Sequence, residues 1–207
     1  MSAVPSPADE AKAWRSALRK ELIARREAAS ATERERWSAQ IAAHIDRLVP
    51  DARGRMVGFC WPYKSEHDAR PIVLRMLAQG ARSALPVVVA PSTPLVFREW
   101  SPGCAMEDGA HGIPVPAASA PPVAPDLVLL PMNGFDREGF RLGYGSGFFD
   151  RTLASLERRP VVIGIGFELG RVDTIRPQPH DIPMDYVVTE AGAWKRGDRG
   201  LAPAVSL

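Results

Sequence analysis

The residues best suited to chemistry lie together in one stretch, Arg141-Leu142-Gly143-Tyr144-Gly145-Ser146-Gly147-Phe148-Phe149-Asp150-Arg151. Three glycines at alternate positions let the backbone adopt positive φ angles and bring its N–H groups close to a ligand. Arginines flank the glycines on both sides, and guanidinium groups match phosphate oxygens in geometry and charge. The stretch therefore predicts a binding site for an anion such as phosphate.

A helix is predicted directly after the glycines, over residues 148–157. Its N-terminus would offer unpaired N–H groups and the positive end of the helix dipole. Asp150 in its first turn is badly placed to contact a phosphate but well placed to hold a Mg²⁺ ion that does. The alternative is a glycine-rich turn with a solvated acid that caps the helix, because the run matches neither a P-loop nor the dinucleotide-binding pattern.

The composition indicates one compact α/β unit. The 207 residues are 45% hydrophobic, which is enough for a sizeable core. A net charge of +2, from 26 basic and 24 acidic residues, gives no indication of nucleic-acid binding. Neither a signal sequence nor an apolar run of membrane-spanning length is present, and two cysteines make no disulfide framework. We expect a cytoplasmic monomer or weak homodimer with neither a membrane nor a nucleic-acid partner.

Two amphipathic helices are predicted before the first strand. Residues 8–29 carry an apolar stripe at four-residue spacing, formed by Trp14, Leu18 and Leu22. The other faces of this helix are basic, and they are either solvated or part of the anion site; their residues are Lys12, Arg15, Arg19 and Lys20. Thr32 and Glu35 predict a capping box for the second helix.

Buried strands are predicted over residues 56–61, 83–90, 126–131 and 161–167, with a short final strand at 186–188. The apolar run without alternation at 126–131 favours a central position in a parallel sheet. The proline-rich residues 101–125 are expected to form an irregular connection that covers a face of the domain or moves as a lid. The whole chain, 1–207, is expected to form a single domain, with loose termini at 1–8 and 192–207.

Two polar loops follow predicted strands, where open α/β sheets bind ligands. Glu66 lies in the first of them and is a candidate substrate contact, whereas His67 and Asp68 are expected to cap the next helix. The second loop contains His180 and Asp181. A carboxylate from this loop either joins Asp150 in a metal site or only forms a turn beside proline.

A longer motif surrounds the glycine stretch and reads Phe135-Asp136-x-x-Gly139-x-Arg141-Leu142-Gly143-Tyr144-Gly145-x-Gly147-Phe148-x-Asp150-Arg151. A His180-Asp181 element and a short strand ending in Thr189-Glu190 follow it. Together with Arg15-x-x-Leu18-Arg19 and Trp61-Pro62-x-x-x-Glu66, these residues resemble the 5-formyltetrahydrofolate cyclo-ligase family over nearly the whole chain. The resemblance implies a three-layer α/β domain with a Rossmann-like, mostly parallel central sheet flanked by helices.

The resemblance also implies an activity and a set of site residues. The activity is an ATP-dependent, Mg²⁺-requiring cyclisation of 5-formyltetrahydrofolate to 5,10-methenyltetrahydrofolate, with Asp150 and Asp181 as metal ligands. Catalytic roles fall to Arg141, Tyr144 and Asp150. ATP would be bound by Arg15, Arg19, Arg141, Leu142, Gly143, Tyr144, Gly145, Ser146, Gly147, Phe148 and Phe149. The folate would be bound by Trp61, Glu66, Tyr144, Gly145, Ser146, Gly147 and Phe148.

Some positions depart from the family pattern, and they leave two alternatives open. Arg15 stands where the family usually has lysine, Ser146 replaces a glycine and Phe149 replaces a tyrosine. One alternative is therefore a cyclo-ligase-like paralogue that binds ATP but acts on a different substrate. The other is a non-catalytic nucleotide- or folate-binding protein, although such a protein would have no need to hold Mg²⁺ at a transferable phosphate.

Overall fold

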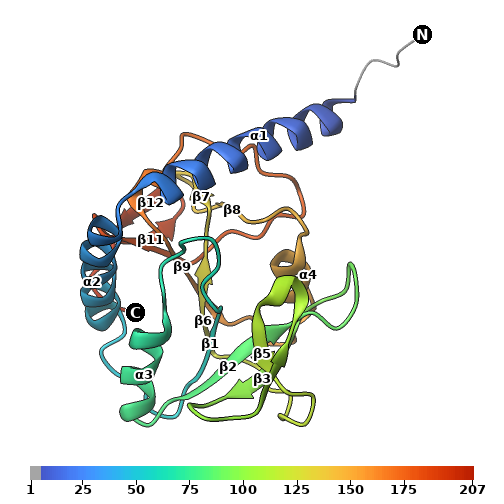
Figure 1. Ribbon diagram of the computed structural model, residues 1–207. Helices are drawn as coiled ribbons and strands as arrows, with labels where there is room; N and C mark the ends of the chain where they lie inside the picture. Colours follow the sequence, from blue (N-terminus) through green and yellow to red (C-terminus); the bar gives the residue numbers. More distant parts are fainter. Residues whose placement is uncertain (1–5) are drawn as a thin grey trace.

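The computed structural model describes residues 6–207 and is built around one eight-stranded sheet (Figure 1). The spatial order of the strands is β12-β11-β10-β9-β6-β1-β2-β3. In chain order they are β1 (Met56–Phe59), β2 (Arg82–Val87), β3 (Val96–Trp100), β6 (Leu127–Pro131), β9 (Val161–Ile165), β10 (Tyr186–Thr189), β11 (Gly192–Gly197) and β12 (Gly200–Pro203). The five strands from β10 to β2 are parallel, whereas β3, β11 and β12 pair antiparallel with their neighbours.

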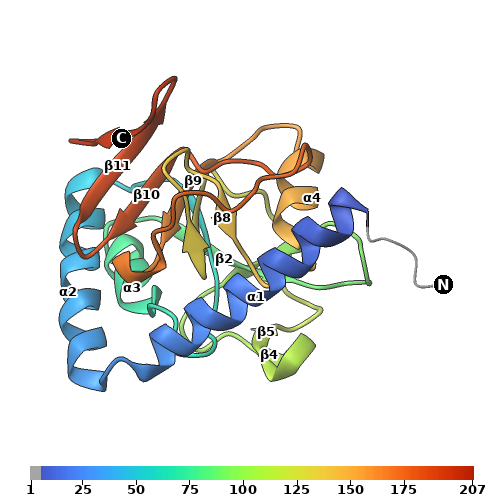
Figure 2. The same ribbon diagram turned by 90° about the horizontal axis from the view of Figure 1, so that it is seen from above.

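Helices lie on both faces of this sheet, as Figure 2 shows from above. They are α1 (Pro7–Ala28), α2 (Ala31–Leu48), α3 (Arg70–Ala78) and α4 (Phe148–Ser155). In the central strand β6, Leu127 and Leu129 pack in one apolar cluster with residues of α2 and α3. Val128 and Leu130 pack in a second cluster, with Leu153 of α4. The predicted three-layer, mostly parallel α/β fold is therefore confirmed, with β6 buried on both faces.

Helix α1 crosses the edge of the sheet where the parallel strands end (Figures 1 and 2). Its Leu22 is fully buried in a third apolar cluster with Leu142 and Ile175. Leu142 belongs to the short strand β8 (Arg141–Leu142), which pairs with β7 (Gly134–Phe135). The apolar stripe predicted for this helix is therefore present, and it fixes α1 against the segment that leads into the glycine stretch.

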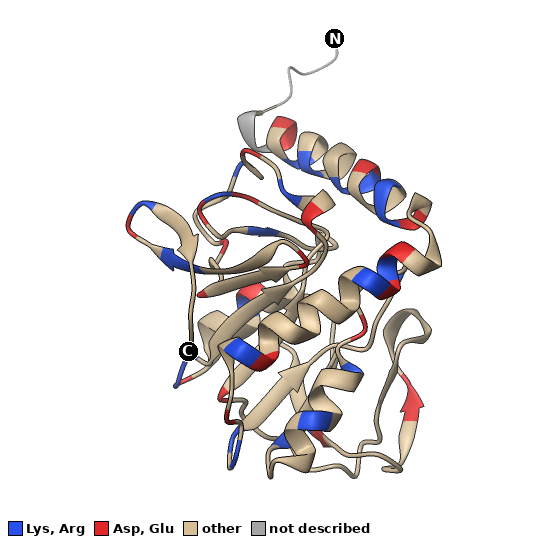
Figure 3. Ribbon diagram, turned by 90° about the vertical axis from the view of Figure 1, so that its left-hand side faces the viewer, with Lys and Arg blue, Asp and Glu red and all other residues tan. Residues whose placement is uncertain are grey.

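The basic residues of α1 are divided between two faces, which the sequence analysis did not anticipate. Lys12 and Lys20 are exposed, whereas Arg15 and Arg19 are half-buried on the side of the apolar stripe. Figure 3 shows that this helix carries both acidic and basic residues along its length. Only its inward-facing arginines are therefore available to a site beneath it.

Three predictions about local structure are wrong. The capping box of α2 is formed by Ser30 and Glu33, not by Thr32 and Glu35, because the helix begins at Ala31. Residues 192–207 are not loose, and 186–188 is not the final strand: β11 covers the edge of β10, and β12 pairs with β11. An uncovered edge would leave backbone N–H and C=O groups of the sheet unpaired. At the other end Ser6 caps α1, and residues 1–5 of the predicted loose terminus lie outside the described residues.

The remaining elements are small. The proline-rich residues 101–125 contain a two-stranded ribbon, β4 (Met106–Asp108) and β5 (Pro114–Pro116), around the 3₁₀ turn η1 (Ala110–Gly112). A second 3₁₀ turn, η2 (Glu168–Gly170), follows β9. Within residues 6–207, no helix has the length and apolar character that crossing a membrane requires.

The C-terminal hairpin generates a stability prediction. Gly200 has a φ of +91°, and a Cβ added there would lie 2.6 Å from the Arg137 carbonyl oxygen. Gly54 also has a positive φ, but no heavy atom lies within 4 Å of an added Cβ. We expect Gly200→Ala to lower the free energy of unfolding by about 2–4 kcal/mol, and Gly54→Ala by about 1–2 kcal/mol from backbone strain alone. Urea unfolding measures both, and equal losses would contradict a rigid contact between the hairpin and Arg137.

Candidate functional site

The glycine loop, residues 143–147, connects β8 to α4. Gly147 occupies the N-cap position of α4 with a φ of 64°, and no side chain caps the helix. Gly145 has a φ of +99°, and an added Cβ would lie 3.0 Å from an Arg19 guanidinium nitrogen. Asp150 is not a solvated cap, because its side chain is only 14% exposed. The geometry therefore argues against the simple capped turn and leaves the N-terminus of α4 without a side-chain partner.

Arginines contact the carbonyl groups of this loop from two sides. The Arg19 Nε donates to the Gly143 oxygen at 2.6 Å, and an Arg151 Nη donates to the Ser146 oxygen at 2.5 Å. Burial, and secondarily the positive charge of Arg15, lowers the pKa of Arg19. Two neighbouring cations that destabilise each other would be stabilised by an anion between them. The electrostatics therefore favour an anionic ligand at this loop.

Two ion pairs lie beside the glycine loop. Arg141 pairs with Asp150 at 3.2 Å, and their side chains are 6% and 14% exposed. Arg15 pairs with Asp181 at 2.7 Å, and their side chains are 16% and 8% exposed. The Ile182 N–H donates to Asp150 at 3.1 Å. Because Ile182 directly follows Asp181, this bond links the two ion pairs. The structure thus brings α1, the start of α4 and the residue 178–182 turn together, as the sequence analysis expected of one site.

The two carboxylates beside the glycine loop could hold Mg²⁺ only if a ligand supplies further oxygens. Within residues 6–207, no three His, Cys, Asp or Glu side chains form a group that could hold a metal. Asp150 and Asp181 offer two hard carboxylates, and Mg²⁺ is commonly held by one or two carboxylates together with phosphate oxygens. Asp181 also accepts from the Gln178 N–H at 2.7 Å, which fixes its orientation. The residues therefore fit a Mg²⁺–phosphate complex better than a metal held by protein alone.

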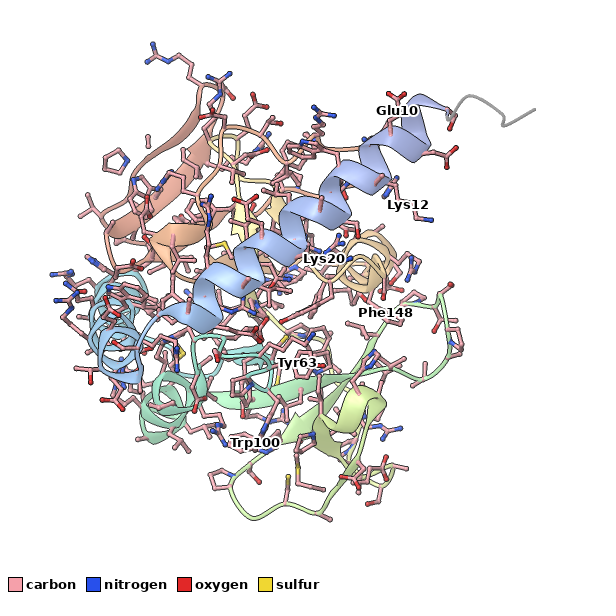
Figure 4. All side chains as sticks on the ribbon, turned by 45° about the horizontal axis from the view of Figure 1, so that its top comes forward. Glu10, Lys12, Lys20, Tyr63, Trp100 and Phe148 are labelled. Carbon is pink, nitrogen blue, oxygen red and sulfur yellow. The ribbon has the colours of Figure 1, made fainter. Side chains whose placement is uncertain are left out.

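Glu66 and Tyr144 form a second polar group, joined to the glycine loop by Tyr144 itself. The Tyr144 hydroxyl donates to Glu66 at 2.9 Å, and the Tyr63 N–H donates to the other oxygen of Glu66 at 3.0 Å. Burial raises the pKa of Glu66, and the hydrogen bond from Tyr144 counters that rise. Figure 4 labels Tyr63, on the loop after β1, and Phe148, the first residue of α4. The structure thus brings Glu66 to the glycine loop, as predicted.

The remaining predicted site residues are placed less favourably. The ring of Trp61 packs 6.4 Å from that of Trp100 and 4.5 Å from the Arg70 guanidinium group, and no contact within residues 6–207 joins it to the glycine loop. Leu142 is fully buried and Phe149 packs against the second apolar cluster. The side chain of Leu142 is therefore not available to a ligand, whereas that of Phe149 is only partly buried.

His67 does not cap α3, contrary to the prediction. Asp68 does accept a hydrogen bond from the Arg70 N–H at the start of that helix, at 3.0 Å. His67 is 5% exposed, lies 3.0 Å from the Ser38 hydroxyl of α2 and packs against Phe167. Burial lowers its pKa to about 4. It is therefore a neutral structural residue beneath the loop that carries Glu66.

Two further polar residues escaped the sequence analysis. Arg26 and Asn133 are each 3% exposed, and an Arg26 Nη donates to the Asn133 side-chain oxygen at 2.9 Å. Another Arg26 Nη lies 3.3 Å from the Tyr144 hydroxyl, which connects the pair to Glu66. Helical periodicity could have predicted that Arg26 points toward the site, because it follows Arg19 by two helical turns and therefore lies on the same face of α1. No local pattern distinguished Asn133 from a turn former.

Comparisons with known proteins agree with the family resemblance of the sequence. A family model described as the 5-formyltetrahydrofolate cyclo-ligase family matches residues 11–190. A protein of that name from Mycolicibacterium smegmatis is 31% identical over 182 residues, which cover 84% of this chain and 93% of that protein. The one from Escherichia coli K12 is 27% identical over 177 residues, with coverages of 83% and 97%. The structure of Aquifex aeolicus 5,10-methenyltetrahydrofolate synthetase aligns with a TM-score of 0.76 and 28% identity, covering 92% of this chain and 96% of that one.

The buried His67 generates a prediction for stability against pH. Its pKa is about 4 in the folded protein and ordinarily about 6.5, so the unfolded chain binds more protons below pH 6.5. Stability is therefore lost as the pH falls. From about pH 7.5 to about pH 5 this residue should lower the free energy of unfolding by about 2 kcal/mol. Urea unfolding of the wild type and of His67→Gln measures the difference. A wild type that loses no more stability over this range than the variant would contradict the buried, neutral imidazole.

Proposed function

This chain belongs to the 5-formyltetrahydrofolate cyclo-ligase family, and we propose that it has the activity of that family. The proposed reaction is the ATP- and Mg²⁺-dependent conversion of 5-formyltetrahydrofolate to 5,10-methenyltetrahydrofolate, with release of ADP and phosphate. The main structural support for this proposal is the arrangement of charged groups around the glycine loop. Arg15 and Arg19 of α1 meet the glycine loop and two carboxylates at the open N-terminus of α4. Positive charge, free N–H groups and paired acids at one place suit a metal-bound polyphosphate.

The phosphates of ATP would lie against the glycine loop. Backbone N–H groups at the start of α4 and the guanidinium groups of Arg19 and Arg151 supply the positive potential there. Arg15 and Arg141 now hold Asp181 and Asp150, so they are already oriented beside the place where phosphate charge would arrive. Mg²⁺ bound between the phosphates and these two carboxylates would neutralise part of the charge on the transferred group.

The folate would lie on the side of Glu66 and Tyr144. The carboxyl oxygens of Glu66 accept hydrogen bonds, and the reduced pterin ring carries N–H donors that match them. Tyr144 belongs to both halves of the site, because its backbone is part of the glycine loop and its hydroxyl donates to Glu66. Trp61, packed beside Trp100 and Arg70, is proposed to border the folate on the α3 side.

The chemistry needs ATP because the oxygen of an N-formyl group is a weak nucleophile and a poor leaving group. In the proposed sequence this oxygen attacks the γ-phosphoryl group and ADP leaves. N10 then forms a bond to the formyl carbon and loses its proton, and the C–O bond breaks as inorganic phosphate departs. The chain contributes positioning and charge neutralisation by Arg141 and the loop N–H groups, rather than a strong base.

A direct assay separates this proposal from its alternatives. Purified protein with 5-formyltetrahydrofolate, ATP and Mg²⁺ should produce the absorbance of the methenyl product, and omission of ATP or Mg²⁺ should abolish it. ATP hydrolysis without this chromophore would favour the paralogue with another substrate. Binding of ATP with no phosphate release in the presence of any folate would favour the non-catalytic binding protein.

Asp150 provides the sharpest test of the proposed metal site. Asp150→Asn keeps the size of the side chain but removes the charge that would hold Mg²⁺, and we expect kcat/KM to fall by about 100-fold or more. Asp173→Asn is the matched control, because Asp173 is exposed and lies on the segment that leads to the residue 178–182 turn. The thermal midpoint of Asp150→Asn should fall, because Arg141 loses its buried charged partner, but the variant should remain folded at the assay temperature, whereas Asp173→Asn should match the wild type. Near-normal turnover by Asp150→Asn would overturn the assignment of Asp150.

A further inference from the structure

Arg26 in the last turn of α1 joins three segments that are distant in sequence. Its Nε donates to the Lys64 carbonyl oxygen at 2.9 Å, in the loop that carries Glu66. One Nη donates to the Asn133 side-chain oxygen at 2.9 Å, just beyond β6, and the other lies 3.3 Å from the Tyr144 hydroxyl. The side chain is 3% exposed. Every nitrogen of this buried guanidinium group therefore has a partner at the folate side of the proposed site.

The direct hydrogen-bond partners of Arg26 are all neutral. Within residues 6–207, no carboxylate forms an ion pair with it, and Asn133 accepts its hydrogen bond without carrying a charge. Burying a cation that no carboxylate contacts directly is costly. The nearby carboxylate is Glu66, which Arg26 reaches through the Tyr144 hydroxyl. The charge acts on Glu66, whose pKa it lowers against the effect of burial. The positive charge of Arg26 thereby favours the ionised form of Glu66.

The Lys64 contact has a second consequence, for the shape of the loop. Lys64 and Ser65 have φ angles of 46° and 57°, which are unfavourable for residues with a side chain. Strained backbone of this kind persists only where surrounding contacts hold it. The bond from Arg26 to the Lys64 carbonyl lies two residues before Glu66 and holds this part of the loop in place. Arg26 thus holds the backbone of Glu66 as well as its electrostatic environment.

We propose that Arg26 is a positioning residue for folate recognition. It holds the Glu66 loop and the Tyr144 hydroxyl in fixed positions relative to each other. Its partner Asn133 is neutral, so the positive charge of Arg26 is not cancelled there and acts on Glu66. The inference rests on the proposed function, since it deepens the role of Glu66 in that site. The groups that face Glu66 are Arg26 from α1, Tyr144 from the glycine loop and the Cys60 thiol from the end of β1. Of these, only Arg26 carries a positive charge.

Asn133→Asp separates this role from a merely structural one. The change keeps the size and the hydrogen bond of residue 133 but gives Arg26 a counter-ion. If Arg26 served only to hold the fold, the new ion pair would leave turnover unchanged and stability equal or higher. If its charge is needed at Glu66, the variant should be folded with an undiminished thermal midpoint, yet kcat/KM for the folate should fall by about 10-fold or more. Unchanged turnover would overturn the proposal.

Arg26→Gln tests the same residue directly, with Arg25→Gln as the matched control. Arg25 is the preceding residue on α1, pairs with Glu21 and has a side chain 56% exposed, so its replacement should leave the kinetics unchanged. We expect Arg26→Gln to lower kcat/KM for the folate by about 100-fold. The KM for ATP should stay near the wild-type value, because Arg15 and Arg19 remain docked. An equal rise in both KM values would indicate displacement of the whole helix and would contradict the proposal.

The pKa of Glu66 supplies a readout that does not depend on turnover. Carbon-13 NMR of labelled glutamate side chains, with Glu66 assigned by its loss in Glu66→Gln, should show a higher pKa in Arg26→Gln than in the wild type or in Arg25→Gln. An unshifted Glu66 would overturn the proposal even if turnover falls. If the wild type forms no methenyl product, the proposed function fails, whereas this titration still decides whether Arg26 controls Glu66.

Discussion

The burial of Leu22 beneath α1 is the contact on which the site depends. This side chain is fully buried with Leu142 and Ile175, and an added Cβ at Gly134 would lie 2.5 Å from its Cδ1 atom. The missing side chain of Gly134 therefore lets the helix approach the β7–β8 ribbon closely. Because a helix is rigid, that single apolar contact also determines where the arginines on the same face arrive. The positions of the α1 arginines are therefore set by the apolar packing of the same helix.

The arginines of α1 and β8 around the site are only partly paired with carboxylates. Arg15 and Arg141 have carboxylate partners, whereas Arg19 contacts a carbonyl group and Arg26 contacts neutral groups. Buried and half-buried cations that no carboxylate contacts directly reduce stability unless a ligand brings negative charge. An anionic ligand would therefore contribute binding energy by compensating charge that folding has already placed there, with little reorganisation of the side chains.

Much of this arrangement could be predicted from the sequence because it is encoded locally. The glycine stretch, the continuous apolar run of β6 and the four-residue spacing in α1 each follow from a short-range rule of backbone conformation or burial. The C-terminal hairpin could not be predicted in the same way. Strands β11 and β12 lack a strong apolar pattern, and their pairing depends on the free edge of β10, which only the assembled sheet provides.

Arg26 could not be predicted as a site residue from the sequence, again because its role depends on distant contacts. Arg26 belongs to the same helical face as Arg19, but its partners lie 38, 107 and 118 residues away along the chain. A buried arginine is recognisable only when those partners are known, since an arginine near a helix C-terminus is otherwise explained by the helix dipole. The same helix contacts the glycine loop through Arg19 and the Glu66 loop through Arg26. The geometry of both halves of the site is therefore coupled through α1, and a displacement of this helix would alter both together.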